Sequence, residues 1–133
     1  YAQVLTFRNC TDVSVENLTA GHTKDPGYCI GGVLLFENCT NVLVSKCGLY
    51  GCGTIGVQAN DSRNVAIQNN EIYECSYGGI SLNNVATASM DGNAFRDLGD
   101  EYGGFVYQVF SDCSEVTFEG KRVVPGTQEA YAK

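Results

Sequence analysis

Two short polar segments hold the residues of this chain that are best suited to act on a ligand. Residues 22–29 begin with the only histidine, His22, and residues 97–103 follow Arg96. The carboxylates of the two segments are Asp25, Asp97, Asp100 and Glu101. Glycoside hydrolysis requires a general acid and a second carboxylate about 5 to 10 Å apart, and two loops that lean toward each other could supply that pair. Acids on the loops of an acidic protein are also commonly solvated charge alone.

Two tyrosines add an aromatic surface between these segments. Tyr50 and Tyr73 are 23 residues apart, and Arg96 follows Tyr73 at the same interval. Sugars dock on aromatic faces and form hydrogen bonds with carboxylates, so the pattern predicts a shallow glycan-binding trough with a tyrosine floor. The alternative is that tyrosines repeated at one interval stack on a surface for packing alone. The predicted binding residues are His22, Asp25, Tyr50, Tyr73, Arg96, Asp97, Asp100 and Glu101, and no residue is assigned a catalytic role.

The chain contains seven cysteines, an odd number that excludes complete internal pairing. It has no CxxC pair and a single histidine, so no metal site and no cofactor is predicted. Cys52 and Cys75 share one register at the 23-residue interval, which would bring their Cα atoms close enough for a disulfide. The alternative is that most cysteines are reduced and pack inside the protein as small apolar residues.

An internal repeat determines where these side chains lie. Residues 33–56 and 57–79 share one design at an offset of 23, which stretches to 29 toward the N-terminus and 28 toward the C-terminus. The two polar segments are the insertions that the longer offsets require. The residues between the apolar positions are mostly polar or small, which indicates β-strands. The apolar rows are Val13, Val42, Val65, Ala88 and Val116; Val15, Val44, Ile67, Met90 and Phe118; Phe7, Phe36, Ala59, Leu82 and Phe110; and Ala20, Leu49, Ile72, Phe95 and Val123.

A period in the low twenties fits a leucine-rich repeat or a parallel β-helix. Leucine is missing from most repeated positions, so the rows predict an all-β parallel β-helix of about five coils, with ~23 residues per coil and ~4.8 Å between coils. Asparagine and aspartate at the turns tolerate left-handed backbone. Asn70 and Asn93 should stack at an inner corner. The residues expected to be buried are Phe36, Val42, Val44, Val65, Ile67 and Leu82, and a ladder of small residues should join Cys10, Cys39, Ser62, Val85 and Cys113.

The stretches NCTNVLVSKCGLYGC (residues 38–52) and DSRNVAIQNNEIYEC (residues 61–75) contain the motif N-V-x-V/I followed by N/C-x-I/L. In this motif the sequence resembles the right-handed parallel β-helix repeat proteins of the pectin-lyase-like superfamily, over roughly residues 5–123. The resemblance and the usual crossover preference imply a right-handed helix. The superfamily includes polysaccharide lyases, glycoside hydrolases, carbohydrate-binding repeats and surface proteins.

The enzyme motifs of that superfamily are missing from this sequence. It has no N-T-D motif, no Asp-Asp pair and no G-H-G motif, and no acidic ladder accompanies Lys46, Arg63 or Arg96. We therefore expect a non-catalytic module of a bacterial surface or secreted protein, which contacts a carbohydrate or a protein or acts as a spacer. The alternative is a polysaccharide lyase or glycoside hydrolase whose site is the trough between the two inserted loops.

Length and charge set the remaining expectations. The 133 residues, 44% of them hydrophobic, fit one β-helix domain over residues 1–124 followed by a tail at residues 125–133. A net charge of −7 argues against nucleic acid and against an anionic membrane as partners, and no apolar run is long enough to insert into a bilayer. Because Tyr1 leads into the first coil within four residues, we expect further coils or a neighbouring domain on that side, and self-association of an isolated fragment.

Overall fold

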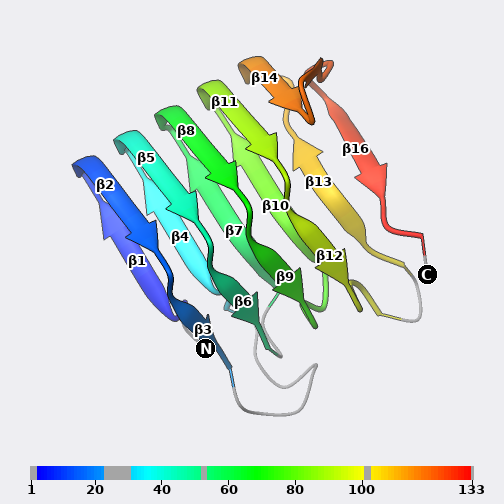
Figure 1. Cartoon of the computed structure of the whole chain (residues 1–133). Helices are drawn as coiled ribbons and strands as arrows, with labels where there is room; N and C mark the ends of the chain where they lie inside the picture. Colours follow the sequence, from blue (N-terminus) through cyan, green and yellow to red (C-terminus); the bar gives the residue numbers. More distant parts are fainter. Residues whose placement is uncertain (1–2, 23–30, 52–53, 101–102, 133) are drawn as a thin grey trace.

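The computed structural model describes residues 3–22, 31–51, 54–100 and 103–132. Within these ranges every regular element is a β-strand, and the strands stack in three sheets along one axis, as the rows of arrows in Figure 1 show. The chain passes through the sheets in turn, and each circuit places its strands beside those of the circuit before. The prediction of an all-β parallel β-helix is confirmed.

The three sheets are named A, B and C. Sheet A contains, in spatial order, β1 (Leu5–Arg8), β4 (Leu34–Glu37), β7 (Ile55–Asn60), β10 (Gly78–Asn83), β13 (Phe105–Val109) and β16 (Thr127–Ala130). Sheet B contains β2 (Thr11–Glu16), β5 (Thr40–Ser45), β8 (Arg63–Gln68), β11 (Ala86–Asp91), β14 (Ser114–Phe118) and β15 (Lys121–Arg122). Sheet C contains β3 (Thr19–Gly21), β6 (Gly48–Tyr50), β9 (Glu71–Tyr73) and β12 (Ala94–Arg96). Pairing is parallel throughout, except where β16 joins β13 and β15 joins β14.

The first two predicted rows are the inward columns of sheet B. Val65 pairs with Val42 on one side and with Ala88 on the other, and Ile67 pairs with Val44 in the same way. The six residues predicted to be buried are at most 2% exposed: Phe36, Val42, Val44, Val65, Ile67 and Leu82. Burial of apolar surface contributes about 25 cal/mol per Å², so these continuous columns stabilise the stack of coils.

The third predicted row is wrong by one residue in the fifth coil. Leu82 pairs with Val109, which is buried, and Phe110 is exposed instead. A turn at residues 111–112 explains the shift, because it adds one residue between β13 and β14. The turn is closed by a hydrogen bond from the Cys113 amide to the Phe110 carbonyl (3.1 Å).

The fourth predicted row ends at Phe95, because the fifth coil has no strand in sheet C. Instead β15 turns back and pairs antiparallel with β14. Glu119 and Gly120, both with positive φ (50° and 78°), make the two-residue turn that such a hairpin requires. Val123 is still buried, but it does not pair with Phe95.

The segment 125–133, predicted to be a tail, contains a strand of the sheet. Strand β16 lies beside β13 and runs antiparallel to it, with Gln128 opposite Gln108. Gly126 has a φ of 85° at the turn that leads into β16, and its amide donates to the Val109 carbonyl (2.8 Å). Nothing in the repeat predicts this strand, because its pairing direction is opposite to that of the coils.

Asparagine and aspartate occupy left-handed turns at the outer corners, as predicted. Their φ values lie between 52° and 60° for Asn9, Asn38, Asp61 and Asn84 in one column and Asp12, Asn41 and Asn64 in another. Side-chain amides connect successive coils: Asn64 donates to Asn41 (2.8 Å) and Asn41 donates to Asp12 (2.9 Å). The second column continues with Thr87, a β-branched residue whose φ is 64°.

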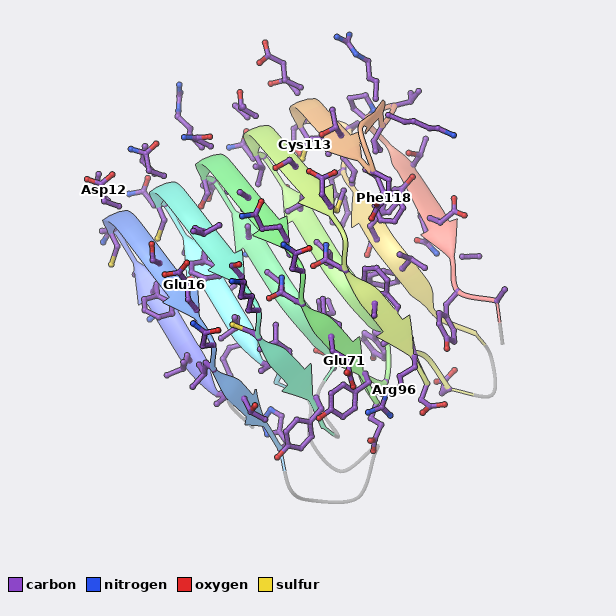
Figure 2. The ribbon with its side chains drawn as sticks, viewed as in Figure 1. Asp12, Glu16, Glu71, Arg96, Cys113 and Phe118 are labelled. Carbon is purple, nitrogen blue, oxygen red and sulfur yellow. The ribbon has the colours of Figure 1, made fainter. Side chains whose placement is uncertain are left out.

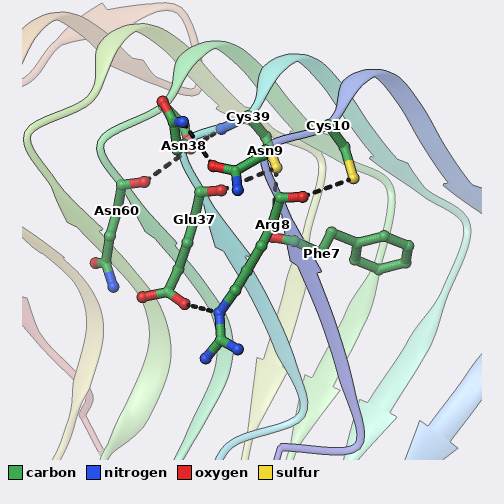
Figure 3. Close-up of polar contacts among 9 residues, drawn as sticks. Phe7, Arg8, Asn9, Cys10, Glu37, Asn38, Cys39 and Asn60 are labelled. Atoms are coloured by element: carbon green, nitrogen blue, oxygen red, sulfur yellow. Dashed lines mark hydrogen bonds and ion pairs between the residues drawn. The ribbon is translucent and has the colours of Figure 1, made fainter.

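Inside the first corner, small donors satisfy backbone carbonyls. The thiol of Cys10 donates to the Arg8 carbonyl at 3.2 Å, as Figure 3 shows, and the Ser62 hydroxyl donates to the Asn60 carbonyl at 2.9 Å. The Cys39 thiol lies 3.4 Å from the carbonyl of Glu37 and 3.4 Å from that of Phe7 in the coil before. A cysteine here fills a small inward space and also supplies a weak donor.

Inside the second corner, the predicted amide stack is present. The Asn70 amide group donates to the Val44 carbonyl (3.1 Å) and to Asn93 Oδ1 (2.9 Å), and Asn70 Oδ1 accepts from the Cys47 amide (2.9 Å). Asn93 in turn donates to the Ile67 carbonyl (2.9 Å). The two buried corners thus meet the same need, a donor for a carbonyl that points inward.

Candidate functional site

Six of the eight predicted binding residues can be placed. Asp25 and Glu101 lie outside the described residues, as does Cys52 of the predicted disulfide. The first inserted segment was predicted to form a wall of the trough, and its residues 23–29 also lie outside the described residues. Three of the placed residues, Tyr50, Tyr73 and Arg96, are brought together on sheet C.

Tyr50, Tyr73 and Arg96 form one continuous stack along the outer face of sheet C. The ring centroids of Tyr50 and Tyr73 are 5.3 Å apart, and their planes differ by 13°. Arg96 lies on the coil next to Tyr73, and its guanidinium carbon is 3.9 Å from the Tyr73 ring centroid, a cation–π contact. Burial, followed by the nearby Glu71 carboxylate, raises the pKa of the Tyr73 hydroxyl.

Arg96 is held by two carboxylates as well as by the ring. Its Nη2 and Nε atoms donate to Glu71 Oε1 at 2.8 and 3.1 Å, and Nη1 lies 3.5 Å from Asp97 Oδ2. Figure 2 shows Arg96 and Glu71 side by side at the edge of sheet C. The hydrogen bond to Glu71 raises the pKa of the guanidinium. Of the five N–H groups of the guanidinium, two form hydrogen bonds with Glu71, and the contact with Asp97 is an ion pair.

The stack leaves the tyrosine ring faces little room for a sugar. Tyr73 lies between Tyr50 and Arg96, so both of its faces have a neighbour. On the other side of Tyr50, a Cβ at Gly21 would collide with the Tyr50 carbonyl and would come within 2.7 Å of the Tyr50 ring. The ring of Tyr50 therefore covers this glycine. The described geometry matches packing on the surface, the alternative that the sequence left open for the two tyrosines.

His22 has a structural contact. It follows β3, is half-buried, and its Nε2 lies 2.9 Å from the Gly32 carbonyl. A carbonyl oxygen only accepts, so Nε2 carries the proton of this hydrogen bond. The contact ties the end of β3 to the residues that precede β4.

The second insertion is anchored in the core and closed by its own backbone. Leu98 is fully buried, and Asp97 before it adopts left-handed backbone with a φ of 53°. Asp100 and Gly103 exchange two backbone hydrogen bonds, each 3.1 Å long. A Cβ at Gly99 would collide with the Gly103 carbonyl, so the close approach requires a glycine at this position.

A cleft of about 550 Å³ lies between this insertion and β16 at the C-terminal side of the stack. Its lining includes Tyr77, Asp100, Phe105, Gln108, Gln128 and Tyr131. Backbone hydrogen bonds fix its aromatic residues: the Phe105 amide donates to the Tyr77 carbonyl (3.1 Å) and the Tyr131 amide to the Gly104 carbonyl (3.0 Å). The Tyr77 side is open, because this residue is 57% exposed.

Tyr131 also borders a neighbouring cleft of about 370 Å³ whose lining includes Asp97 and Gly99. The Asp97 amide donates to the Tyr131 hydroxyl at 2.8 Å, so this tyrosine ties the insertion to the residues that follow β16. A third hollow of about 330 Å³ lies on sheet B over Asn41 and Asn64.

Sequence reasoning missed most of the larger cleft. It singled out Asp100, but it did not single out Tyr77, Gln108, Gln128 or Tyr131. Gln108 and Gln128 meet only because β16 pairs with β13, and that pairing has no counterpart elsewhere in the repeat. The one available signal was an aromatic residue, Tyr131, in the segment that the repeat did not explain.

The described cysteines Cys10, Cys39, Cys47, Cys75 and Cys113 are free thiols. Burial, followed by the Glu74 carboxylate, raises the pKa of the Cys75 thiol to about 12, so this thiol stays protonated at neutral pH. A disulfide between Cys75 and Cys52 stays a prediction. Thiol titration of the unfolded, unreduced protein tests it, because seven free thiols would exclude it and five would support one bridge.

Neither a metal centre nor a membrane-spanning helix is found in the described ranges. No group of three or more histidine, cysteine, aspartate or glutamate side chains there is placed to hold a metal ion. The described residues also include no helix with the length and apolar character needed to cross a bilayer.

Comparison with known proteins gives one match. No curated protein and no solved structure matches the chain. A family model described as the right-handed beta helix region matches residues 5–123, which spans every coil of the stack. The match agrees with the parallel coils of the structure and with the right-handed sense that the resemblance implied. The chain therefore belongs to the right-handed β-helix family.

Proposed function

We propose that this β-helix is a non-catalytic module that holds a carbohydrate in the cleft lined by Tyr77, Gln108, Gln128 and Tyr131. One observation carries the proposal: an exposed tyrosine ring, that of Tyr77, stands at a cleft that also contains two side-chain amides and a carboxylate. Apolar ring faces with a few placed polar groups are the usual composition of a small-ligand site.

The polar groups of the cleft suit a ligand rich in hydroxyl groups. Gln108 and Gln128 are directly opposite each other on antiparallel strands, so their side chains share one face of sheet A. Each amide offers both a donor and an acceptor, and Asp100 adds acceptors. Sugar hydroxyl groups both donate and accept, so they can form hydrogen bonds with the amides of Gln108 and Gln128, while the Tyr77 ring packs against the C–H face of a pyranose.

The number of carboxylates among the described lining residues of the cleft favours binding over hydrolysis. Asp100 is the one carboxylate among its described lining residues, whereas hydrolysis requires a pair about 5 to 10 Å apart. A glycan ligand also fits the predicted place on a bacterial surface or in a secreted protein.

A glycan array with matched tyrosine variants tests the proposal. The unmodified protein should bind a subset of oligosaccharides, and Tyr77→Ala should weaken that binding at least tenfold. Tyr50→Ala removes a tyrosine from the stack on sheet C and should leave binding unchanged. Binding by no glycan, or equal binding by Tyr77→Ala, would favour the spacer, and release of new reducing ends from a bound glycan would favour an enzyme.

A further inference from the structure

Four uncharged polar residues form one row across the outer face of sheet A. The row contains Gln58, Ser81, Gln108 and Gln128, each paired in register with the next. It crosses β7, β10, β13 and β16, which are neighbours in the stack of strands in Figure 1. We infer that this row extends the cleft into a longer site for a linear glycan, whose successive sugar units lie along the axis of the stack. The inference rests on the proposed function and adds the form of the ligand to it.

The row faces away from the core. Val57 and Ala59, on either side of Gln58, are fully buried. Successive side chains of a strand point to opposite faces, so Gln58 and the residues in register with it point outward. Ser81 is only 4% exposed, whereas Gln58 and Gln108 beside it are half-buried. The glutamine amides are therefore the groups of this row that a ligand can reach.

The amides of the row have no partner within the described part of the chain, unlike those of the outer asparagine ladder. Each amide of that ladder donates to the coil before, at 2.8 Å in the case of Asn64. No described residue forms a hydrogen bond with the side chain of Gln58, Gln108 or Gln128. Ser81 separates Gln58 from Gln108 by two strand spacings, about 10 Å, which is too far for a direct bond. Each glutamine thus keeps a donor and an acceptor for a ligand.

The length of the row fits a short chain of sugars. Three strand spacings place Gln58 and Gln128 about 14 Å apart along the axis. A pyranose unit of an extended 1,4-linked chain advances by nearly one strand spacing, so about four units cover the row. One end of the chain then lies in the cleft at Tyr77, and the other lies over Gln58. Leu35, which pairs with Gln58 on the next strand, is apolar and ends the polar row.

Titration calorimetry with oligosaccharides of two lengths tests the inference. The probes are the disaccharides and tetrasaccharides of β-1,4-linked glucose and of β-1,4-linked galactose. In a series that binds, the tetrasaccharide should bind about tenfold more tightly than the disaccharide, because its added units reach the outer amides. Gln58→Leu removes the amide farthest from the cleft and keeps a side chain of similar size. It should weaken tetrasaccharide binding about fivefold and leave disaccharide binding unchanged.

Gln68→Leu is the matched control. Gln68 is a half-buried glutamine on the outer face of β8 in the same coil, so this variant should bind both lengths as the unmodified protein does. Thermal melting establishes that both variants fold.

Three results would overturn the inference and leave the proposed function standing, provided that Tyr77→Ala still weakens binding. They are equal affinity for the two lengths, undiminished tetrasaccharide binding by Gln58→Leu, and an equal loss in Gln58→Leu and Gln68→Leu. Absence of binding by both series also overturns the inference. Absence of binding on the glycan array as well overturns the proposed function.

Discussion

The aromatic stack on sheet C and the cleft beside β16 use the same residue type with opposite results. Tyr50 and Tyr73 lie in register on successive coils, so each ring covers one face of the other. The guanidinium of Arg96 covers the second face of Tyr73. Tyr77 lies where the repeat is interrupted by an insertion and by an antiparallel strand, and it remains 57% exposed. Side chains in register satisfy one another, whereas a break in the repeat leaves side chains available to a ligand.

The largest expected effect comes from breaking the columns that support both regions. Val65→Asp places a charge in an inward column that is 1% exposed, where neighbouring coils exclude water. We expect the free energy of unfolding, measured by denaturant titration, to fall by about 3–5 kcal/mol. Ala66→Asp is the control, because its side chain lies on the outer face of the same strand and should cost about 1 kcal/mol or less. Equal losses would contradict the described register.

The asparagine side chains test how much the hydrogen bonds within an in-register ladder stabilise the fold. Asn70→Ala removes a buried amide and leaves the Cys47 amide and the Val44 carbonyl without this partner, so it should cost about 2–4 kcal/mol in chemical denaturation. Asn64→Gly removes an exposed amide from the outer ladder but keeps the left-handed backbone, and should cost about 0.5 kcal/mol. A cost for Asn64→Gly that matches Asn70→Ala would show that burial does not set the value of these bonds.

The tyrosines test the comparison directly. Tyr73→Ala removes a stacked ring and a cation–π contact and should lower the free energy of unfolding by about 1–2 kcal/mol. Tyr77→Ala should change it by no more than about 0.5 kcal/mol, because the side chain is largely exposed. Both values follow from thermal melts monitored by circular dichroism. If the two costs were reversed, Tyr77 would be a packing residue and the cleft would lose its principal wall.

The smallest expected effect is a gain in stability. Thr87 holds left-handed backbone at an exposed corner where the two preceding coils have Asn41 and Asn64. Thr87→Asn relieves the strain of a β-branched residue and lets the outer amide ladder extend by one coil, so it should stabilise the domain by about 0.5–1 kcal/mol. Thr40→Asn, at an exposed position without positive φ, should bring no gain in a parallel melt. A similar gain at both sites would argue against the strain.

The sequence predicted the parts of the structure that repeat. In a stack of coils, equal spacing along the chain becomes adjacency in space, so the row through Val65 and the amide pair Asn70 and Asn93 followed from spacing alone. Spacing also predicted that Tyr50 and Tyr73 would be neighbours. It left open whether the tyrosines stack for packing or present their faces to a ligand, because that depends on the direction of the rings and of the Arg96 side chain.

The parts that do not repeat could not be predicted in the same way. A turn closed by the hydrogen bond from Cys113 to Phe110 adds one residue before β14, and this extra residue moves Phe110 out of its row. Strand β16 pairs in the opposite direction to the coils, so no offset in the sequence relates it to β13. The cleft depends on this antiparallel strand, and its residues Gln128 and Tyr131 come from the stretch where periodicity carried no information.

The direction of the backbone hydrogen bonds gives this domain unequal mechanical strength along different axes. In all three sheets these bonds join one coil to the next, along the axis of the stack. A force applied along that axis pulls directly on the few bonds of a single coil interface, and coils should detach one after another at low force. A force applied across the axis must slide whole strands past each other, which loads all the bonds of an interface at once. If this domain links two attachment points, it should therefore resist a force across the coils much better than a force along the axis of the stack.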